Sequence, residues 1–529
     1  MTDRYYLTTP IYYVNDVPHI GHAYTTLACD VIARFMRLDG REVKFLTGTD
    51  EHGQKVEKSA AAAGVAPKEF VDRVSQNFRD LAAQMGYSND DFIRTTEARH
   101  IRACQALWRA IAANGDIYLG HYEGWYSVRD EAFWAEDELV VGADGKKRAP
   151  TGADVEWVRE PSYFFRLSGW QDRLLKFYDT HPDFILPESR RNEVVSFVKG
   201  GLHDLSISRT TFSWGVPVPD APGHIMYVWL DALTNYLTAI GYPDTTPEFP
   251  RLWPADLHMV GKDIIRFHAV YWPAFLMAAG LEPPRRVFAH GWWTNEGQKI
   301  SKSLGNVIDP LMLTAEFGLD PVRYFLMREV PFGNDGDFSR AAMIDRINND
   351  LANGFGNLCQ RVLSMIAANC GGAVPAAGTL ADHDRALLAA AGVLLADVRN
   401  ALLSQQIHVA LAQLWSVVGE ANRYVDTEAP WKLKKSDPAR MATVLYVLIE
   451  VIRHLGVLLQ PFMPASAAKI LDQVAIPLGA ARSFAALAAG GLVAGTPLPK
   501  PQGIFPRHEP PGAPVADAKP PKGRPPVQG

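Results

Sequence analysis

Residues 5–22 read YYLTTPIYYVNDVPHIGH, a β-rich run that leads through a loop into the start of a helix near His19. The run 43–47 is a second expected strand, ended by Gly48, and apolar residues recur at helical spacing after Pro67 and again over 101–111. Strands that alternate with helices in this order are typical of a doubly wound parallel sheet. The sequence therefore predicts an α/β fold with a Rossmann-like sheet.

The composition and the periodicity of the sequence change twice after residue 115. From about 116 to 225 it is rich in Trp, Tyr, Gly and charged residues without clear periodicity, which predicts an inserted domain. Strand-like runs return at 257–261 and 286–290, and after 331 apolar stripes at 387–402, 407–418 and 441–459 predict a helical bundle. We therefore divide the chain into a first catalytic half (1–115), an insertion (116–225), a second catalytic half (226–330), a helical domain (331–496) and a proline-rich disordered tail (497–529).

Length and composition bound the class of protein. The chain has 529 residues, 47% of them hydrophobic and 21% charged, which suits a globular protein of several domains. We expect no membrane span, since no run approaches the roughly 20 apolar residues required, and we see no signal peptide. The four cysteines form no CxxC pair, which favours a reducing, cytoplasmic location. A net charge of -5 neither indicates nor excludes a local basic site for nucleic acid.

The segment His19-Ile20-Gly21-His22 lies where a helix begins after a strand. A helix N-terminus offers N–H donors and positive potential to an anion, and two imidazoles there add donors for a phosphate chain. Gly21 would let a nucleotide approach the backbone. Taken alone, the segment could equally be a polar helix cap.

A second motif, Lys299-Ile300-Ser301-Lys302-Ser303, follows the expected strand at 286–290. Two ammonium groups and two hydroxyls on such a loop suit a pyrophosphate that leaves when the α-phosphate of ATP is attacked, because they stabilise charge that develops in the transition state. Both motifs, in this order on a strand–helix scaffold, indicate a nucleotide site. No GxxxxGK[ST] loop is present, which disfavours a P-loop NTPase.

The two motifs resemble the paired signatures of class I aminoacyl-tRNA synthetases, and their surroundings from about residue 5 to 462 resemble the methionyl-tRNA synthetase family. The resemblance implies activation of L-methionine by ATP and Mg²⁺ as an adenylate, and its transfer to initiator and elongator tRNA(Met). It assigns catalysis to His19, His22, Lys299 and Lys302, and ATP binding to these four residues with Gly21, Ser301 and Ser303.

Further matched segments imply the methionine pocket. By resemblance, Asp50 binds the substrate ammonium, and the pocket is formed by Ile11, Tyr13, Val228, Trp229, Ala232, Tyr236, Ile264 and His268. Polarisable rings around a thioether contribute roughly 0.3–1.5 kcal/mol each. Trp229 and Tyr236 could instead be ordinary core aromatics. The isoleucine, leucine and valine enzymes carry a larger insertion than this chain, and the cysteine enzyme needs zinc ligands that we do not find.

The insertion departs from many relatives, which hold zinc there through Cys-x-x-Cys pairs. Ser127 and Asp130 stand at the first pair, and the stretch 149–152 lacks thiols at the second. Structural zinc prefers thiolate or imidazole ligands. We therefore predict no zinc, and we expect aromatic packing by Trp125, Tyr126, Phe133 and Trp134 to replace it.

The helical domain resembles the family's anticodon-binding domain. Asn357 and Arg361 match the family's anticodon-reading segment and, four residues apart on a helix, share one face. We find no counterpart of the family's base-stacking tryptophan, take Ala429-Pro430-Trp431 as structural, and name Phe484 as a weak substitute. In place of a C-terminal tRNA-binding module that also dimerises some relatives there is a proline-rich tail, which predicts a monomer.

Two other functions fit these residues less well. A silent tRNA-binding protein on the same scaffold would have no need for His19, His22, Lys299 and Lys302. A nucleotidyltransferase that makes an adenylyl cofactor shares the first signature, but the tryptophan-rich insertion and the helical bundle disfavour it.

Overall fold

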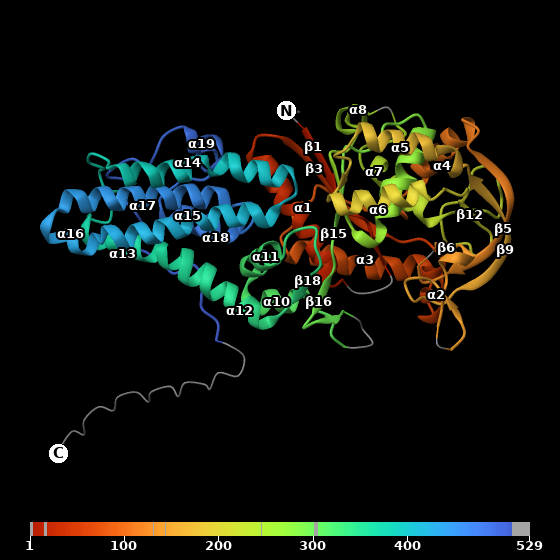
Figure 1. Cartoon of the computed structure of the whole chain (residues 1–529), viewed down its shortest axis with the longest axis horizontal. Helices are drawn as coiled ribbons and strands as arrows, with labels where there is room; N and C mark the ends of the chain where they lie inside the picture. Colours follow the sequence, from red (N-terminus) through yellow and green to blue (C-terminus); the bar gives the residue numbers. More distant parts are fainter. Residues whose placement is uncertain are drawn as a thin grey trace, which may run out of the picture.

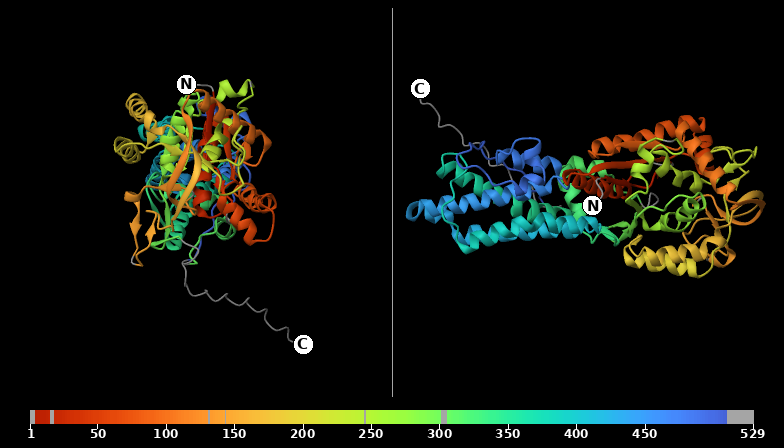
Figure 2. Two further views of the ribbon diagram at one scale, coloured as in Figure 1. Left: turned by 90° about the vertical axis from the view of Figure 1, so that its right-hand side faces the viewer. Right: turned by 90° about the horizontal axis from the view of Figure 1, so that it is seen from above.

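The computed structural model describes residues 4–14, 18–130, 132–142, 144–244, 246–300 and 305–509. The molecule is elongated, with a helical bundle at one end, a parallel sheet in the middle and a long β-ribbon at the other end (Figure 1). Seen from above, the bundle and the sheet domain lie end to end (Figure 2). This arrangement agrees with the predicted fold class.

The central sheet has seven strands in the order β10-β15-β14-β1-β3-β2, with β4 also paired to β3. Every pair is parallel. The bounds are β1 Arg4–Thr8, β2 Tyr12–Tyr13, β3 Glu42–Asp50, β4 Asp91–Arg94, β10 Ile185–Leu186, β14 Leu257–Gly261 and β15 Val287–His290. Residues on both faces are buried, as Tyr6 and Leu7 on successive positions of β1 illustrate. Parallel strands covered on both faces read as continuous apolar runs, which is why the sequence pattern revealed them.

Helices cover the two faces of the sheet and form two hydrophobic cores. Helices α1 (Ile20–Leu38) and α11 (Leu319–Arg328) belong to one core, which continues into the helical bundle. Helices α4 (Ala98–Ala113), α7 (Val228–Thr238) and α9 (Trp272–Ala278) belong to the other. The remaining helices of this part are α2 Gln54–Ala62, α3 Pro67–Gln84, α8 Glu248–Leu252 and α10 Pro310–Phe317.

The insertion is built on a long antiparallel ribbon, β5 (Ile117–Ser127) with β9 (Glu156–Phe165), flanked by β6 (Ala132–Trp134) and β11 (Leu205–Ser206). Its smaller pairs are β7 Val140–Val141 with β8 Lys147–Arg148, and β12 Ser208–Arg209 with β13 Ile225–Met226. In the sequence between β9 and β11, helices α5 (Gln171–Thr180) and α6 (Glu188–Lys199) flank β10, which pairs with β15 of the central sheet. The range 116–225 therefore combines the insertion with a return to the catalytic sheet, a detail that the sequence pattern did not reveal.

The helical domain contains α12 Arg340–Arg346, a π-helical turn η6 Ile347–Gly356, α13 Asn357–Asn369, α14 Asp382–Leu403, α15 Ile407–Glu428, α16 Pro430–Ser436, α17 Pro438–Leu459, α18 Pro464–Gln473 and α19 Ala485–Ala488. A fully buried ion pair ties this domain to the first signature helix: Arg323 of α11 lies 2.7 Å from Asp30 of α1 and donates to the carbonyl of Phe462 at 2.8 Å. Arg399 of α14 adds a 2.6 Å contact to Asp39, the C-cap residue of α1. The bundle is thus attached to the same helix that begins at His19.

A short ribbon follows the sheet near the second signature. It contains β16 Trp293–Asn295, β17 Gln298–Lys299 and β18 Gly336–Phe338.

The expectation that no segment is long and apolar enough to cross a membrane is not met. By length and composition alone, helices α14 and α17 are both long and apolar enough. Most of α17 is buried, and it packs against α14, α15 and α18 within the bundle. Core helices of a bundle pass this test, so the pair is weak evidence for a span.

The prediction of a disordered tail is wrong for residues 497–509. The Leu498 N–H donates to the carbonyl of Gly372 at 2.8 Å, and Leu498, Ile504 and Phe505 pack against the core of the bundle. Near its end, the His508 N–H donates to Asn348 Oδ1 at 2.9 Å, and Asn348 Nδ2 donates back to the His508 carbonyl at 2.8 Å. A few apolar side chains suffice to order a proline-rich segment when they pack against a hydrophobic core. Residues 510–529 lie outside the described part.

Candidate functional site

The first signature caps α1 through its own side chains. His19 is the N-cap residue; its Nδ1 accepts from the Gly21 N–H at 3.1 Å, and His22 Nδ1 accepts from the His19 N–H at 3.0 Å. Burial lowers the pKa of both imidazoles, that of His22 well below its usual value with a smaller contribution from His19. Both rings are therefore neutral at pH 7, and because each Nδ1 accepts, Nε2 carries the proton. Each ring thus keeps an Nε2–H donor at the positive end of a helix, as a phosphate site requires.

Gly21 has a local structural role that the sequence did not reveal. A Cβ at this position would lie 2.9 Å from Cε1 of His19. Such contacts are too close, so a side chain at Gly21 would displace the His19 ring and break the cap. The close approach of a nucleotide to Gly21 stays a prediction.

The second signature is only partly described. The backbone of Lys299 ends β17, paired with Thr294, while Ser301, Lys302 and Ser303 lie outside the described residues. Beyond the loop, the carbonyl of Ile308 accepts a hydrogen bond from the Ile20 N–H at 3.1 Å. This bond brings the exit of the second signature to the first turn of the helix that begins at His19.

The predicted methionine residues gather from four segments at the carboxyl edge of the sheet. Tyr13 of β2 pairs in register with Asp50 at the end of β3. Helix α7 carries Val228, Ala232 and Tyr236, all buried, while Trp229 is half-buried. Ile264 and His268 follow β14 in a 3-10 turn, η3 (Lys262–Ile264), and a π-helical turn, η4 (Phe267–Tyr271). Ile11 and Tyr13 are partly buried and pack against the same core.

A chain of hydrogen bonds fixes the deepest part of this region. His268 Nδ1 donates to the Ile264 carbonyl at 3.0 Å, so its Nε2 accepts from the Tyr236 hydroxyl at 2.7 Å. Burial lowers the pKa of His268 to about 4, against a smaller opposite effect of the bond to Ile264. The imidazole is therefore neutral at pH 7. Both of its nitrogens and the Tyr236 hydroxyl have hydrogen-bond partners within the protein. The surface that they offer to a ligand is mainly apolar ring.

Three aromatic residues were not among the predicted pocket residues. Phe267 stacks on Trp229, with ring centroids 3.7 Å apart and planes 5° from parallel. His258 stacks on Tyr236 at 4.1 Å, and the Trp272 ring lies 6.0 Å from Tyr236. Phe267 could have been suggested by its position next to His268. The contact of His258 with Tyr236 depends on β14 lying against α7, which no local pattern reveals.

Leu233 of α7 is buried in the same hydrophobic core as the rest of its helix and does not form an exposed rim of the pocket.

The positions that hold zinc in many relatives form a polar network here. Ser127 Oγ accepts from the Asp130 N–H at 3.2 Å, and Arg129 donates to Thr151 Oγ1 at 2.9 Å. The Thr151 hydroxyl donates in turn to the Asp130 carboxylate. A hydroxyl pair with one carboxylate does not fit the closed sulfur–nitrogen shell of structural zinc.

Aromatic packing accompanies this network, as expected for Tyr126 and Phe133, whose rings lie 4.8 Å apart. Trp125 contacts Trp157 at 5.3 Å, a partner that the sequence did not suggest. The buried Arg209 guanidinium lies 4.2 Å above the Phe133 ring and 4.7 Å above Tyr227, the residue before α7. This arginine therefore connects the insertion to the helix that carries the predicted methionine residues.

The predicted anticodon residues belong to α13, a helix of the bundle that lies close to α16 (Figure 1). Asn357 is exposed, and Arg361 makes a 2.7 Å ion pair with Asp426. The Arg361 guanidinium also lies 5.5 Å from the ring centre of Trp431, which is 48% exposed. Exposed lysines follow Trp431 on α16: Lys432, Lys434 and Lys435.

These contacts correct the interpretation of two aromatic residues. Phe484 is 3% exposed and packs on Phe35 of α1 at 4.9 Å, so it cannot stack on a base. Trp431, for which the sequence predicts a structural role, exposes about half of its surface to solvent beside Arg361. An exposed aromatic ring with flanking cations is typical of a single-strand nucleic-acid site.

Comparisons with known proteins identify the family. The sequence matches the family model "tRNA synthetases class I (M)" over residues 5–363, and "anticodon binding domain of methionyl tRNA ligase" over residues 374–509. It is 59% identical over 513 residues to the methionine–tRNA ligase of Mesorhizobium japonicum, covering 97% of this chain and 99% of that protein. The enzyme of Brucella suis is 58% identical over 506 residues, 96% of this chain and 98% of that protein.

A solved structure is also similar. Mycobacterium tuberculosis methionyl-tRNA synthetase in complex with methionyl-adenylate superposes with a TM-score of 0.93 at 56% identity, covering 96% of this chain and 100% of that one.

Proposed function

This chain belongs to the methionyl-tRNA synthetase family, and on this premise we propose which of its residues activate methionine with ATP and which recognise the tRNA that receives it. The observation that carries the proposal is the convergence of two sites at one sheet edge. Asp50 and the α7 aromatics lie at the carboxyl ends of the strands, where the His19–His22 cap also begins α1. Ligands of open α/β sheets bind at this edge.

In the first step the methionine carboxylate attacks the α-phosphorus of ATP, a P–O bond forms, and the bond to pyrophosphate breaks. His19 and His22 donate through Nε2–H to the phosphate chain, which the helix N-terminus also attracts. Lys299 and Lys302, with the hydroxyls of Ser301 and Ser303, stabilise the charge that builds on pyrophosphate. Mg²⁺ enters with the ATP phosphates and neutralises part of their charge.

Methionine is held at two points. Asp50 binds the ammonium as an ion pair, and the side chain lies among Tyr13, Trp229, Tyr236 and His268. Since the polar atoms of Tyr236 and His268 bond to each other, a thioether meets ring surface there and no hydrogen-bond donor is left unsatisfied. Ile11, Val228, Ala232 and Ile264 complete the apolar wall.

The second step transfers methionine to tRNA(Met), whose anticodon we assign to the far end of the bundle. Asn357 and Arg361 read base edges, as amide and guanidinium groups do with splayed single-stranded bases. Trp431 stacks on one base, and the lysines of α16 contact phosphates. The support is the exposure of Trp431 and its contact with Arg361.

Further proposals concern the state of the protein. We propose that it works in the cytoplasm as a monomer without zinc and without a membrane partner, since α17 is mostly buried in the bundle and packs against α14. The support for the absence of zinc is the hydroxyl and carboxylate donor set at Ser127, Asp130 and Thr151.

Amino-acid-dependent exchange of pyrophosphate into ATP, run across the twenty amino acids, tests the proposal. We expect exchange with methionine to exceed that with any other amino acid, and aminoacylation of tRNA(Met) but not of other tRNAs. Exchange that prefers leucine, isoleucine or valine, or no exchange at all, would contradict it.

A further inference from the structure

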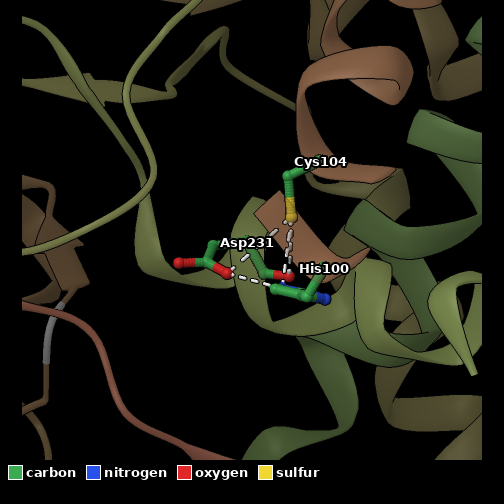
Figure 3. A group of neighbouring side chains, drawn as sticks. All are labelled: His100, Cys104 and Asp231. Carbon is green, nitrogen blue, oxygen red and sulfur yellow. Dashed lines mark hydrogen bonds and ion pairs between the residues drawn. The ribbon is translucent and has the colours of Figure 1, made fainter. Parts of the chain in front are cut away.

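The buried carboxylate of Asp231 connects three segments of the fold close to the proposed methionine pocket. Asp231 of α7 is fully buried, with Oδ2 2.7 Å from His52 Nδ1 and Oδ1 2.8 Å from His100 Nε2. His52 follows β3, and His100 belongs to α4. Figure 3 shows Asp231 beside His100, with Cys104 next to both. On its other side, His100 Nδ1 contacts the Thr238 hydroxyl at 3.0 Å.

The spacing of these groups indicates hydrogen bonds and not a metal site. Ligand atoms of a tetrahedral ion, bound at roughly 2.0–2.3 Å, lie about 3.3–3.7 Å apart. The His100–Asp231 distance of 2.8 Å is too short for that. Burial raises the pKa of the Cys104 thiol well above its usual value, so the thiol keeps its proton, and it lies 3.7 Å from the Asp231 carbonyl as a donor. Cys104 is therefore a neighbour of the network and not a thiolate ligand.

The network stays charged at physiological pH. Burial alone would raise the pKa of Asp231, but the attraction of His52 and the hydrogen bonds from His100 and His52 outweigh it and lower the pKa to about 2. An ionised carboxylate that accepts from two imidazoles makes charge-assisted bonds, which are short and directional. Such bonds hold their partners more rigidly than apolar contacts do.

Two of the three segments, the loop after β3 and helix α7, carry the two halves of the proposed methionine site. His52 is two residues beyond Asp50, and Asp231 lies on α7 between Trp229 and Ala232. A second set of contacts fixes the same loop: Arg94 makes a bidentate pair with Glu51 at 2.6 and 2.9 Å, and Trp214 donates to the Glu51 carbonyl at 2.6 Å. Neither of these contacts reaches α7, whereas Asp231 does. The position of the loop relative to α7 therefore depends on Asp231.

We propose that Asp231 is a positioning residue, which holds the loop of Asp50 at a fixed distance from the aromatic wall on α7 so that the ammonium and the side chain of methionine are bound together. This inference rests on the proposed methionine site. It assigns Asp231 no contact with substrate. Loss of Asp231 should therefore weaken the binding of methionine. The binding of ATP should not change, because its predicted residues lie at the start of α1 and on the 299–303 loop.

The test is Asp231→Asn, which preserves size but removes the charge and one of the two acceptors. In the exchange reaction we expect the KM for methionine to rise about 10- to 100-fold, the range for losing a hydrogen bond to a charged group. The KM for ATP should change less than twofold. An unchanged KM for methionine, equal rises in both KM values, or a fall in kcat alone would overturn the proposal.

A second pair of variants separates positioning from loss of folding. His52→Asn keeps a donor near the place of Nδ1, whereas His52→Ala removes it. We expect the KM for methionine of His52→Asn to be several-fold closer to the unmodified protein than that of His52→Ala, with thermal unfolding measured for both. Equal KM values for the two would overturn the proposal even if Asp231→Asn fails to fold. Exchange by the unmodified protein is the control, because its failure would refute the methionine site itself and not the role of Asp231.

Discussion

Replacement of Trp431 by alanine isolates the proposed anticodon contact. The ring is 48% exposed, and about half of that free surface, roughly 60 Å² for a tryptophan, would be covered by one stacked base. The base loses a similar area, so at about 25 cal/mol per Å² the contact is worth at most about 3 kcal/mol. Alanine substitutions of stacking residues cost about 1–3 kcal/mol per base. We therefore expect a loss of about 2 kcal/mol, a fall of about 30-fold in kcat/KM for tRNA.

The assay compares two reactions of the same variant. Aminoacylation should show the loss, whereas tRNA-independent pyrophosphate exchange should be unchanged, because α16 lies at the outer end of the bundle, away from the central sheet (Figure 1). Trp431→Phe keeps a smaller ring, so its kcat/KM for tRNA should lie between that of the unmodified protein and that of Trp431→Ala. Val393→Ala, another exposed apolar residue of the bundle, is the matched control and should change neither reaction. Equal damage to exchange and aminoacylation, or no loss in aminoacylation, would refute the stacking role.

Asn357→Ala and Arg361→Ala should each weaken aminoacylation by about 1–3 kcal/mol, the range for a base-reading contact, and spare exchange; damage to both reactions would mean a structural role. Lys302→Ala should reduce the rate of adenylate formation severely with little change in the methionine dissociation constant measured by equilibrium binding, since the ammonium acts on the departing pyrophosphate; the reverse pattern would sink the assignment. Metal analysis of the purified protein should find no stoichiometric zinc, and chelation followed by restored magnesium should leave exchange unchanged; one tightly bound zinc per chain would overturn this. Burial lowers the pKa of His268 to about 4 in the folded protein, below about 6.5 in the unfolded chain, so the unfolded state binds more protons between these values. Stability should therefore be full above pH 6.5 and fall as the pH drops toward 4, and His268→Gln should flatten the slope of unfolding free energy by up to about 1.4 kcal/mol per pH unit; an unchanged slope in urea titrations would contradict the shift.

Local patterns in the sequence were enough for the architecture and for the start of the helix at His19. Continuous apolar runs such as 257–261 predict a sheet buried on both faces, and the apolar stripe at 441–459 predicts the buried helix α17, because each pattern has a period set by its own backbone. The cap at His19 and His22 is also local, since donors and acceptors lie within four residues of one another. The family was evident from these segments and is confirmed by the comparisons.

Contacts between distant segments were decided by the tertiary structure alone. Asp231 meets His52 and His100 across 179 and 131 residues, and nothing in the sequence around any of the three indicates that they meet. Trp431 and Phe484 are both aromatic residues of the helical domain, yet one is exposed and the other buried, because exposure depends on which helices pack over a residue. Likewise residues 497–509 have a composition typical of disorder, but Leu498, Ile504 and Phe505 pack against the hydrophobic core that other helices provide. Periodicity describes a segment's own geometry, whereas exposure and partnership depend on the rest of the chain.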